Sequence, residues 1–554
     1  MIHLNVIACI DYQNRIGYNN QLIYDITEDK HFFKYITICN DINNENSINQ
    51  EVSNIVIMGK NTWYSINQKP LSNRINIIIS NDISIQKQIQ KFNNVYLYNN
   101  LNSFIQNIET IDNLYLFNHL YIKNIFVIGG SYLYKEVINT DNSCNHNEWC
   151  ISQLFITKVN NHKLTKNQCQ ELDSINNNDF IYFPEIDKDT FKLTKSIEYI
   201  SNSNKLNKEI FKNNNENQNI FLSFNLYQNK KIINITNNND NSINNNINKE
   251  SFYNFINDLI NRSKIKYHEE YQYLNIMNDL LLNGEERQTR NSITKSNFGL
   301  RMEFNLENNK IPILTTKKVA IKTVLKELLW FISGDTNNKT LQQQGVHIWD
   351  GNSSREYLDQ NGFQDREEGE LGPIYGFQWR HFGAEYKDCH TDYKDKGVDQ
   401  LKECIHRIKN NPTSRRMIVN SWNVKDLNIM SLPPCHILFQ WYVSKDNKLS
   451  LQLYQRSGDF FLGIPFNITS YSLLIYMVAH ITGLKPGRLI HIIGDAHIYE
   501  SHTEAINKQL NRIPTEFPQL KINRVVKDID DFKLEDFEFL NYHSFDTIKA
   551  PMIS

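Results

Sequence analysis

The chain has few cysteines, and none of them forms a CxxC pair. Only eight cysteines occur in 554 residues. Cys144 and Cys150 flank His146, and Cys389 adjoins His390, but no second thiol follows at the spacing of a structural zinc site. This usage argues against a disulfide framework and against a structural zinc site. We therefore expect a reduced, cytoplasmic protein with no bound metal.

The chain also lacks an excess of one charge and a long hydrophobic run. Lys and Arg total 59 against 61 Asp and Glu, which gives a net charge of −2. Such a balance provides no global positive field for nucleic acid or anionic lipid, so any phosphate site must be a local cluster. The N-terminus, MIHLNVIACID, has no basic region before its apolar run, and the stretch Tyr471 to Leu484 falls short of the roughly 18 residues of a membrane helix. We expect no membrane span and no obligatory nucleic-acid partner.

Asparagine-rich tracts divide the chain. At roughly 100–200 residues per domain, this length predicts two or more folded units. The densest tract, Asn234 to Asn248, separates two segments with strand and helix patterns of their own. We predict a first domain at 1–228, a linker at 229–266 and a second domain at 267–554. The tracts interrupt dense apolar segments, which argues against an Asn-rich scaffold protein.

The linker contains one amphipathic pattern. Apolar residues recur there at helical spacing: Phe252, Phe255, Ile256, Leu259 and Ile260. The pattern predicts a short helix. Packing on its own domain and crossing to a partner subunit both remain open.

The first half alternates buried strands with helical stretches, which is the layout of an α/β sheet. The predicted strands are Val6–Ile10, Asn54–Met58, Ile75–Ile79, Phe126–Ile128 and Leu154–Val159. Gly59-Lys60-Asn61-Thr62 follows the second strand and Gly129-Gly130-Ser131 follows the fourth. Two such strand-to-helix turns offer backbone N–H groups and a lysine to phosphates.

Asp29 stands among Ile26, Phe32 and Phe33 at the start of a predicted helix. A carboxylate there stabilises a helix N-terminus, or it acts as an acid in a pocket that helps to protonate a substrate. The residues alone leave both readings open.

The segments IACIDYQNRIGYNNQLIYDITEDKHFF, IVIMGKNTWYSI, LSNRINIIIS, IFVIGGSYLYKE, LFITKV and IYFPEID, in this order, resemble dihydrofolate reductase over Met1 to about Gln228. The resemblance implies a mostly parallel twisted sheet with flanking helices, and hydride transfer from NADPH to dihydrofolate. Asp29 would bind the pterin and promote its protonation, supported by Thr157. Arg74 would hold the glutamate carboxylate beside Phe33. The implied cofactor residues are Ala8, Ile16, Gly17, Lys60, Thr62, Ser80, Ile128, Gly129, Gly130, Ser131 and Tyr134.

Three positions depart from that family. Ile23-Tyr24 replaces its usual Pro-Trp, Asn20 replaces a loop glycine, and Asn81 replaces the arginine that usually follows the serine at Ser80. Lys60 and Ser80 remain, so NADPH stays the expected reductant. These departures motivate an alternative in which the reductase half is degenerate and mainly structural.

The second half places a cysteine among arginines. Cys435 follows Pro-Pro in LPPCHILFQ, Arg415 and Arg416 precede it, and Arg456 follows. Cationic neighbours lower a thiol pKa and raise the nucleophilic thiolate fraction, and adjacent arginines suit a nucleotide phosphate. A small core cysteine and a basic surface face are the plain alternatives. Glu327, Asn467, His497 and Tyr499 also interrupt apolar stretches.

A long colinear set of segments resembles thymidylate synthase from about His268 to the C-terminus. It comprises LTTKKVAIKTVLKELLWFISGDTN, GVHIWDGN, LGPIYGFQWRHFGAEY, PTSRRMIVNSWN, LPPCH, QRSGDFFLGIPFN and GDAHIYESH. The resemblance implies an α+β fold in which Cys435 attacks C6 of dUMP. The co-substrate 5,10-methylenetetrahydrofolate then supplies a methylene group and a hydride, and dTMP and dihydrofolate leave.

The resemblance also implies the roles of further residues. Arg415, Arg416, Arg456 and Ser457 would bind the phosphate, the first two coming from the partner in a homodimer formed through this domain. Arg290, with Arg287 as fallback, would be the arginine of the altered loop ERQTRNSIT. Asn467 would read the uracil edge, and His497 and Tyr499 would hold the ribose. Glu327, His436 and Tyr375 would order the water for proton transfers. The folate face would comprise Ile348, Trp349, Asp459, Leu462, Gly463 and Phe466, and the terminal Met552-Ile553-Ser554 would close over the ligands.

The joined halves resemble the bifunctional enzyme of protists and plants, because one domain produces the dihydrofolate that the other consumes. A translational-repressor protein is disfavoured by intact Cys435, Arg456 and Asn467 and by the absence of a basic patch in the composition. Asn467 also disfavours a deoxycytidylate hydroxymethylase.

Overall fold

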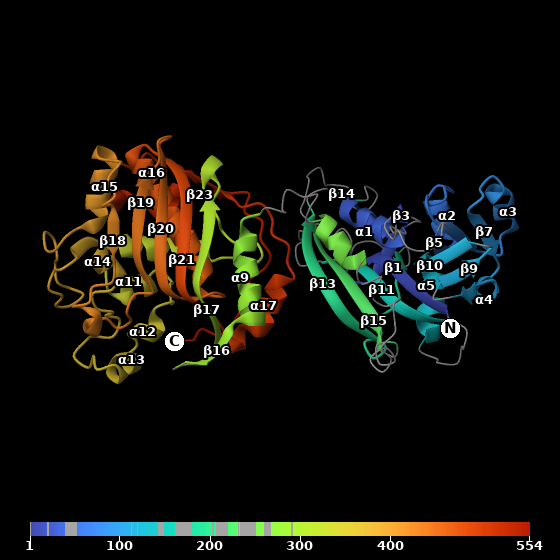
Figure 1. Ribbon diagram of the computed structural model, residues 1–554, viewed down its shortest axis with the longest axis horizontal. Coiled ribbons are helices and arrows are strands. Elements are labelled where there is room, and N and C mark those ends of the chain that lie inside the picture. The colour runs from blue at the N-terminus through green and yellow to red at the C-terminus, as the bar shows by residue number, and fades with distance from the viewer. Residues whose placement is uncertain are drawn as a thin grey trace. The chain divides into compact units, whose positions relative to one another are not determined.

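The computed structural model describes residues 2–18, 21–38, 52–111, 114–118, 120–141, 149–160, 180–201, 204–206, 220–230, 232, 251–259, 268–289 and 292–553. It divides into two compact units, Met1–Lys266 and Tyr267–Ser554 (Figure 1). The densest asparagine tract and the tracts at 41–50 and 213–217 lie outside the described residues.

The first unit is built on a ten-stranded, mainly parallel sheet. Its order is β13-β15-β11-β1-β10-β5-β6-β7, with β8 and β9 beside β10. The bounds are β1 Ile2–Ile10, β5 Val52–Gly59, β6 Ile75–Ile79, β7 Val95–Tyr98, β8 Glu109–Ile111, β9 Leu114–Phe117, β10 Leu120–Gly129, β11 Trp149–Val159, β13 Phe191–Ser201 and β15 Ile220–Asn229. The strands from β11 through β1 to β7 run parallel, while β15 is antiparallel to both of its neighbours, β11 and β13. The predicted α/β class and all five predicted strands are confirmed.

Helices and short strands complete this unit (Figure 1). The helices are α1 Thr27–Thr37, α2 Lys60–Ser65, α3 Ile83–Ile89, α4 Leu101–Ile105 and α5 Ser131–Asp141, and the small strands are β2 Arg15–Tyr18, β3 Gln21–Leu22, β4 Tyr24–Ile26, β12 Phe180–Tyr182 and β14 Asn204–Leu206. The central strands are rich in isoleucine and valine because helices cover both faces of a parallel sheet, leaving no side that must be polar.

Residues 251–259 form a helix that packs on the first unit within this chain. Phe252 and Phe255 are buried, and their rings lie 5.8 Å and 4.8 Å from the ring of Phe32 on α1. Phe255 also contacts Phe224 on β15, with 5.2 Å between ring centroids. The helix therefore braces the outer side of α1.

The second unit combines a six-stranded sheet, β16-β17-β21-β20-β19-β18, with a set of helices. Its strands are β16 Glu285–Gln288, β17 Ile293–Asn305, β18 Ile418–Asn420, β19 His436–Val443, β20 Lys448–Asp459 and β21 Lys485–Tyr499, with β22 Gln519–Ile522 and β23 Phe537–Leu540 as a separate pair. Neighbours in the large sheet are antiparallel except β20 and β21. The helices are α9 Glu270–Asn283, α10 Ile321–Ser333, α11 Asn338–Gln342, α12 Asp350–Ser353, α13 Arg355–Gln360, α14 Tyr375–His381, α15 Gln400–Asn410, α16 Gly463–Thr482 and α17 Thr503–Leu510. The predicted α+β class is confirmed.

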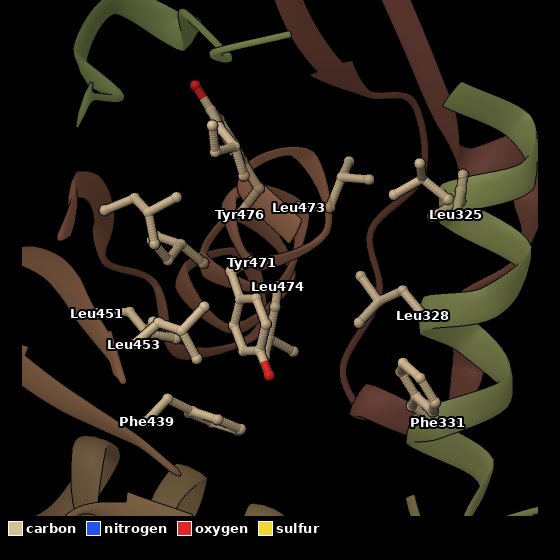
Figure 2. Packing of buried hydrophobic residues seen from close by; sticks show 14 of the residues in the cluster. Leu325, Leu328, Phe331, Phe439, Leu451, Leu453, Tyr471, Leu473, Leu474 and Tyr476 are labelled. Carbon is tan, nitrogen blue, oxygen red and sulfur yellow. The ribbon is translucent and has the colours of Figure 1, made fainter. Parts of the chain in front are cut away.

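Helix α16 is the core of this unit. Figure 2 shows it between Leu328 and Phe331 of α10 and the sheet residues Leu451 and Leu453. With 20 residues and a mean hydropathy of 1.3, it is long and apolar enough to cross a bilayer, but 83% of that window is buried inside the unit. The apolar run from Tyr471 to Leu484 is shorter than the helix, because α16 begins eight residues before Tyr471. Its first turn contains Pro465, which the start of a helix tolerates.

Candidate active sites

Asp29 lies in the first turn of α1 and faces the centre of the parallel sheet. Cys9 on β1 and Thr157 on β11 are paired in register, and both side chains act on its carboxyl group. Burial raises the pKa of Asp29 to about 6, and this effect outweighs the opposing influence of Thr157 and Cys9. A carboxyl that is partly protonated near neutral pH suits the role of an acid in a pocket better than that of an exposed helix charge.

Arg74 lies near the other end of α1. Its Nη1 donates to Thr37 Oγ1 at 2.6 Å, its Nε donates to the Ser72 carbonyl at 3.0 Å, and its guanidinium lies 5.8 Å from the ring centroid of Phe33. The residue is 6% exposed, and burial lowers its pKa to about 10. It forms no ion pair with a described carboxylate, so the guanidinium favours an incoming anion. Eight helical residues separate Asp29 from Thr37, an axial rise of about 12 Å.

Two strand ends meet beside this pocket. A Cβ on Gly129 at the end of β10 would lie 2.5 Å from Thr62 Oγ1 on α2, so only glycine fits there. Gly130 has φ +101°, and a Cβ on it would come within 3.4 Å of Gly59, the residue before α2. The starts of α2 and α5 are thereby held together. Backbone approach this close is the cradle that a dinucleotide phosphate requires.

The remaining implied cofactor residues lie on β1, β2, β10 and α5. Tyr134 on α5 donates its hydroxyl to the Ile7 carbonyl at 2.8 Å, next to Ala8. Ile16 and Gly17 lie on β2, and Ile128 lies on β10. In the loop that departs from the family, Tyr24 is buried on β4, and burial raises its pKa.

Lys60 and Ser80 meet around a carboxylate that the sequence analysis missed. Lys60 Nζ lies 2.7 Å from Asp82 Oδ2, and Ser80 Oγ accepts the Asp82 backbone N–H at 3.1 Å. The lysine holds the pKa of Asp82 down to about 2. A 2′-phosphate at this position must therefore compete with Asp82 for Lys60.

Cys435 is clamped between α14 and β20. Its N–H donates to Tyr375 Oη at 2.8 Å, and its carbonyl accepts the Arg456 N–H at 2.8 Å. The Arg456 side chain donates from Nε to the Pro434 carbonyl at 2.9 Å and from Nη2 to the Pro433 carbonyl at 3.0 Å. The loop that carries the thiol is thus held by the arginine expected to bind phosphate.

The predicted lowering of the Cys435 pKa is wrong for the single chain. Burial raises the pKa of the thiol, and this effect outweighs the opposing influence of Arg456 and of the hydrogen bond with Tyr375. Arg415 and Arg416 are exposed in the loop before β18 and are not among the groups that act on the thiol. A charge pattern along the sequence does not reveal how deeply a thiol is buried.

Glu327 and His436 each form a hydrogen bond with an aromatic side chain. Glu327 on α10 accepts the Trp349 indole N–H at 2.8 Å, and burial raises its pKa to about 7. His436 bonds the Tyr471 hydroxyl at 2.8 Å and stacks on Tyr375 with 4.2 Å between ring centroids. Burial lowers the pKa of His436 to about 3, so it is a neutral imidazole that orders polar partners.

The start of α16 gathers several predicted residues. Asp459 Oδ1 accepts the backbone N–H groups of Phe461 and Leu462 at 2.9 and 3.1 Å. A Cβ on Gly463 would lie 4.0 Å from Asn467 Oδ1, which places the amide over this turn. The Asn467 amide makes no hydrogen bond within the described part of the chain, so it is available to a ligand. Phe466 and Ile348 are half-buried nearby in the same core cluster.

Parallel pairing of β20 with β21 brings Ser457 and Asp459, expected at the phosphate and the folate, beside the strand that carries the expected ribose residues His497 and Tyr499. Ser457 pairs with Asp495, and Asp459 pairs with His497. His497 Nδ1 lies 3.3 Å from Asp495 Oδ1, and its ring lies 5.3 Å from that of Tyr499.

The altered phosphate loop is described only in part. Arg290 lies outside the described residues. Arg287 on β16 lies 2.6 Å from Glu285 and 3.6 Å from Asp495. At the C-terminus the Pro551 carbonyl bonds His502 Nε2 at 2.8 Å, and Met552 is 63% exposed, while Ser554 lies outside the described residues.

Sequence reasoning missed four contributors: Cys9, Asp82, Tyr471, and the bond from Trp349 to Glu327. Tyr471 offered little signal, since Ser470, Ser472 and Tyr476 on the same helix also carry hydroxyl groups. The other three depend on contacts between distant segments.

Comparison with known proteins gives the same division. A thymidylate synthase family model matches residues 271–554, and a dihydrofolate reductase model matches residues 3–215. The chain is 42% identical to a bifunctional dihydrofolate reductase-thymidylate synthase of Plasmodium chabaudi, over 91% of this chain and 84% of that protein. It is 40% identical to a putative protein of that type from Oryza sativa subsp. japonica, over 97% of this chain and 99% of the relative. A bifunctional relative from Paramecium tetraurelia is 37% identical, over 99% and 98% of the two chains.

Proposed function

Because the chain belongs to the bifunctional dihydrofolate reductase-thymidylate synthase family, we propose that its two sites work in series with NADPH as reductant and 5,10-methylenetetrahydrofolate as one-carbon donor. The second unit methylates dUMP to dTMP and releases dihydrofolate. The first unit reduces dihydrofolate to tetrahydrofolate. One chain thus regenerates the folate that it oxidises.

In the synthase unit, Cys435 is the nucleophile. Its sulfur bonds to C6 of dUMP, which makes C5 an enolate carbon that bonds to the methylene carbon of the folate. A base then takes the C5 proton, and the bond between the methylene carbon and the folate nitrogen breaks. Hydride from the released tetrahydrofolate reduces the methylene to a methyl group as the C6–sulfur bond breaks, which leaves dTMP and dihydrofolate. The clamp of Tyr375 and Arg456 around Cys435 is the observation that carries this assignment. Two of the three guanidinium nitrogens of Arg456 hold the Pro433 and Pro434 carbonyls, and Nη1 remains for a phosphate oxygen.

Proton transfers in this site pass through Glu327. With a pKa near 7 it both gives and takes protons at physiological pH, the condition under which general acid–base catalysis is most effective. Asn467 accepts from N3–H of uracil and donates to O4, so cytosine would leave the amide without matching partners.

In the reductase unit, Asp29 binds the pterin and Arg74 the glutamate carboxylate, at the two ends of α1. NADPH would supply the hydride from the cradle formed by Gly59, Gly129 and Gly130. Asp29, assisted by Thr157, keeps a proton near the reacting end of the ring. The Arg74 guanidinium gains the anionic partner that the free chain does not provide.

We place the protein in the cytoplasm as a homodimer. Cys9, Cys150, Cys389, Cys404 and Cys435 are free thiols, which suits a reducing compartment. The sheet face opposite α16 carries Ile418 and Tyr442, which are 43% and 62% exposed. Arg415 and Arg416 directly precede β18 at the edge of this face, so a second copy docked there would receive them in its phosphate site.

A degenerate reductase unit is the alternative, motivated by Ile23, Tyr24 and Asn81. No observation favours it, since the described residues include the buried Asp29 carboxyl group, the Arg74 guanidinium without an ion-pair partner, and the close approach of Gly59, Gly129 and Gly130.

The test is NADPH absorbance with the purified chain and 5,10-methylenetetrahydrofolate, before and after addition of dUMP. We expect NADPH loss to begin only with dUMP, because dihydrofolate is then made in place. Accumulation of dTMP and dihydrofolate at constant NADPH would instead support the degenerate reductase. In Cys435→Ser, dTMP formation should be lost, while reduction of added dihydrofolate continues.

A further inference from the structure

Three chemically distinct ligand groups converge on the surface of the synthase unit, away from Cys435. Glu367 lies in the turn after α13, and Cys389 and His390 lie in the loop after α14. His390 Nε2 is 3.0 Å from Glu367 Oε1, and Cys389 Sγ is 3.6 Å from the same oxygen. All three ligand atoms lie within 4.8 Å of one another. A tetrahedral zinc ion with bonds of about 2.0–2.3 Å separates its ligand atoms by about 3.3–3.7 Å, so small side-chain movements complete such a set.

We propose that Glu367, Cys389 and His390 bind a zinc-like divalent cation that ties their two loops together. Thiolate and imidazole donors select Zn²⁺ and its relatives over Mg²⁺ and Ca²⁺, which prefer oxygen ligands. Three protein ligands leave the fourth position to water. The thiol proton passes to solvent as the sulfur binds, because the ligand is the thiolate.

The backbone around both loops is held in place before any ion binds. Asp388 Oδ1 accepts the N–H groups of His390 and Thr391 at 2.9 and 2.8 Å. Tyr393 Oη accepts the Lys387 N–H at 2.8 Å and donates to the Asp388 carbonyl at 2.9 Å. These bonds fix the loop that presents Cys389 and His390.

The turn with Glu367 is held in a similar way, because the Gly369 N–H donates to the Ser353 carbonyl at 2.9 Å. Little ordering entropy therefore remains to be lost on binding.

The local charge also favours a dication. The carboxylates of Glu367 and Glu370 both act on the Cys389 thiol, so its surroundings attract positive charge. Lys339 Nζ lies 3.8 Å from Glu367, but its side chain is 48% exposed and can swing into solvent.

Cys389 and His390 line a cleft of about 870 Å³. The C-terminal ends of α10 and α14 line the same cleft. Ser333 and Gly334 end α10, which carries Glu327, and His381 ends α14, which begins at Tyr375. An ion at Cys389 and His390 would stiffen the wall behind the synthase site.

The experiment is equilibrium dialysis of the full chain against Zn²⁺ in a Cys435→Ser background, which removes the catalytic thiol as a competitor. We expect one equivalent to bind at the site, and Cys389→Ser, His390→Gln and Glu367→Gln each to weaken it by at least about tenfold. Replacing Zn²⁺ by Co²⁺ should give a thiolate-to-cobalt absorption band that Cys389→Ser removes.

Cys150→Ser is the matched control. Cys150 Sγ also lies beside a histidine, 3.4 Å from His3 Nδ1, but it is not part of a three-ligand group among the described residues. Zn²⁺ binding that is unchanged in the three ligand variants, or lost equally in Cys150→Ser, would overturn the proposal. The ligand residues lie outside both catalytic sites, so retained dTMP formation by these variants with an intact Cys435 shows that they fold.

Discussion

At the residue scale, burial sets the chemistry of the two catalytic carboxyl groups. At Asp29 and Glu327 the loss of water outweighs the opposing polar contacts and, for Asp29, the charge of Lys30, so their pKa values rise to about 6 and about 7. The same burial acts in the opposite sense on His436, whose pKa falls to about 3. Burial keeps both carboxyl groups partly protonated near neutral pH and His436 uncharged.

Asp29 predicts the pH dependence of the reductase. Because its pKa is raised, the carboxyl is protonated below about pH 6 and loses its proton above that value. We expect kcat/KM for dihydrofolate, which reports the free enzyme, to be flat below about pH 6 and to fall as the pH rises through it. Asp29→Asn should lower the rate and remove this inflection. An unchanged inflection in that variant would assign the titration to another group.

The hydrogen bond from Trp349 to Glu327 predicts how the pH profile of dTMP formation responds to mutation. Its indole N–H lowers the pKa of Glu327, so Trp349→Phe should raise that pKa and move the inflection of dTMP formation to higher pH by roughly one unit. Trp330→Phe is the matched control, because Trp330 is also buried but its indole N–H makes no hydrogen bond to the described residues. Equal shifts in both variants would show that indole packing, and not the bond, is responsible.

Individual residues also show which features could be predicted from the sequence and which could not. Cys435, Glu327 and Asp29 could be singled out because each breaks an apolar pattern. The raised pKa of Cys435 could not, because burial comes from segments as distant as Tyr375. Cys389 and His390 drew notice as neighbours, but Glu367 precedes them by more than twenty residues and meets them only through folding.

At the element scale, the sheet strands could be predicted because buried parallel strands are continuous apolar runs. Ile75–Ile79 agrees with β6 at both ends. The pattern failed at α16, where Pro465 in the first turn and Asn467 in the second hid the helix start. Pairing order could not be predicted, because β15 and β13 join the sheet after long asparagine-rich interruptions.

The helix at 251–259 predicts a stabilising brace. Phe255 is 1% exposed and contacts Phe32 and Phe224, so Phe255→Ala should lower the free energy of unfolding of the reductase unit by about 3–5 kcal/mol. Tyr253→Ala is the control on the outer side of the same helix, since Tyr253 is 42% exposed. Urea unfolding compares the two, and equal losses would mean that the contact contributes nothing specific.

The contact between α10 and α14 predicts a selective defect. A Cβ on Gly376 would lie 2.4 Å from the Phe331 carbonyl oxygen, so Gly376→Ala must push α14 away from α10. Tyr375 then moves relative to Cys435, and we expect dTMP formation to be lost while reduction of added dihydrofolate is unchanged. Normal dTMP formation would show that the helices part without moving the tyrosine.

At the scale of the whole molecule, each unit has its own hydrophobic core, so damage to one site should leave the other working. The proposed dimer links the synthase sites of two copies. Tyr442→Arg puts a charge on the exposed sheet face, and we expect it to yield monomers by sedimentation and to lower dTMP formation, because the partner's phosphate arginines are lost. Val525→Arg, at a residue 78% exposed outside the sheet, is the control. A fully active Tyr442→Arg monomer would refute the shared phosphate site.

The position of α16 affects how the protein is made. The helix is complete at Thr482, but the sheet that covers it closes only when β21, residues 485–499, pairs with β17, which left the ribosome roughly 190 residues earlier. At about 5–20 residues per second, β17 waits about 10–40 s for this partner. The reductase sheet has long been complete by then. We therefore expect each newly made synthase unit to expose an apolar helix until β21 is complete, and to depend more on chaperones than the reductase unit that precedes it.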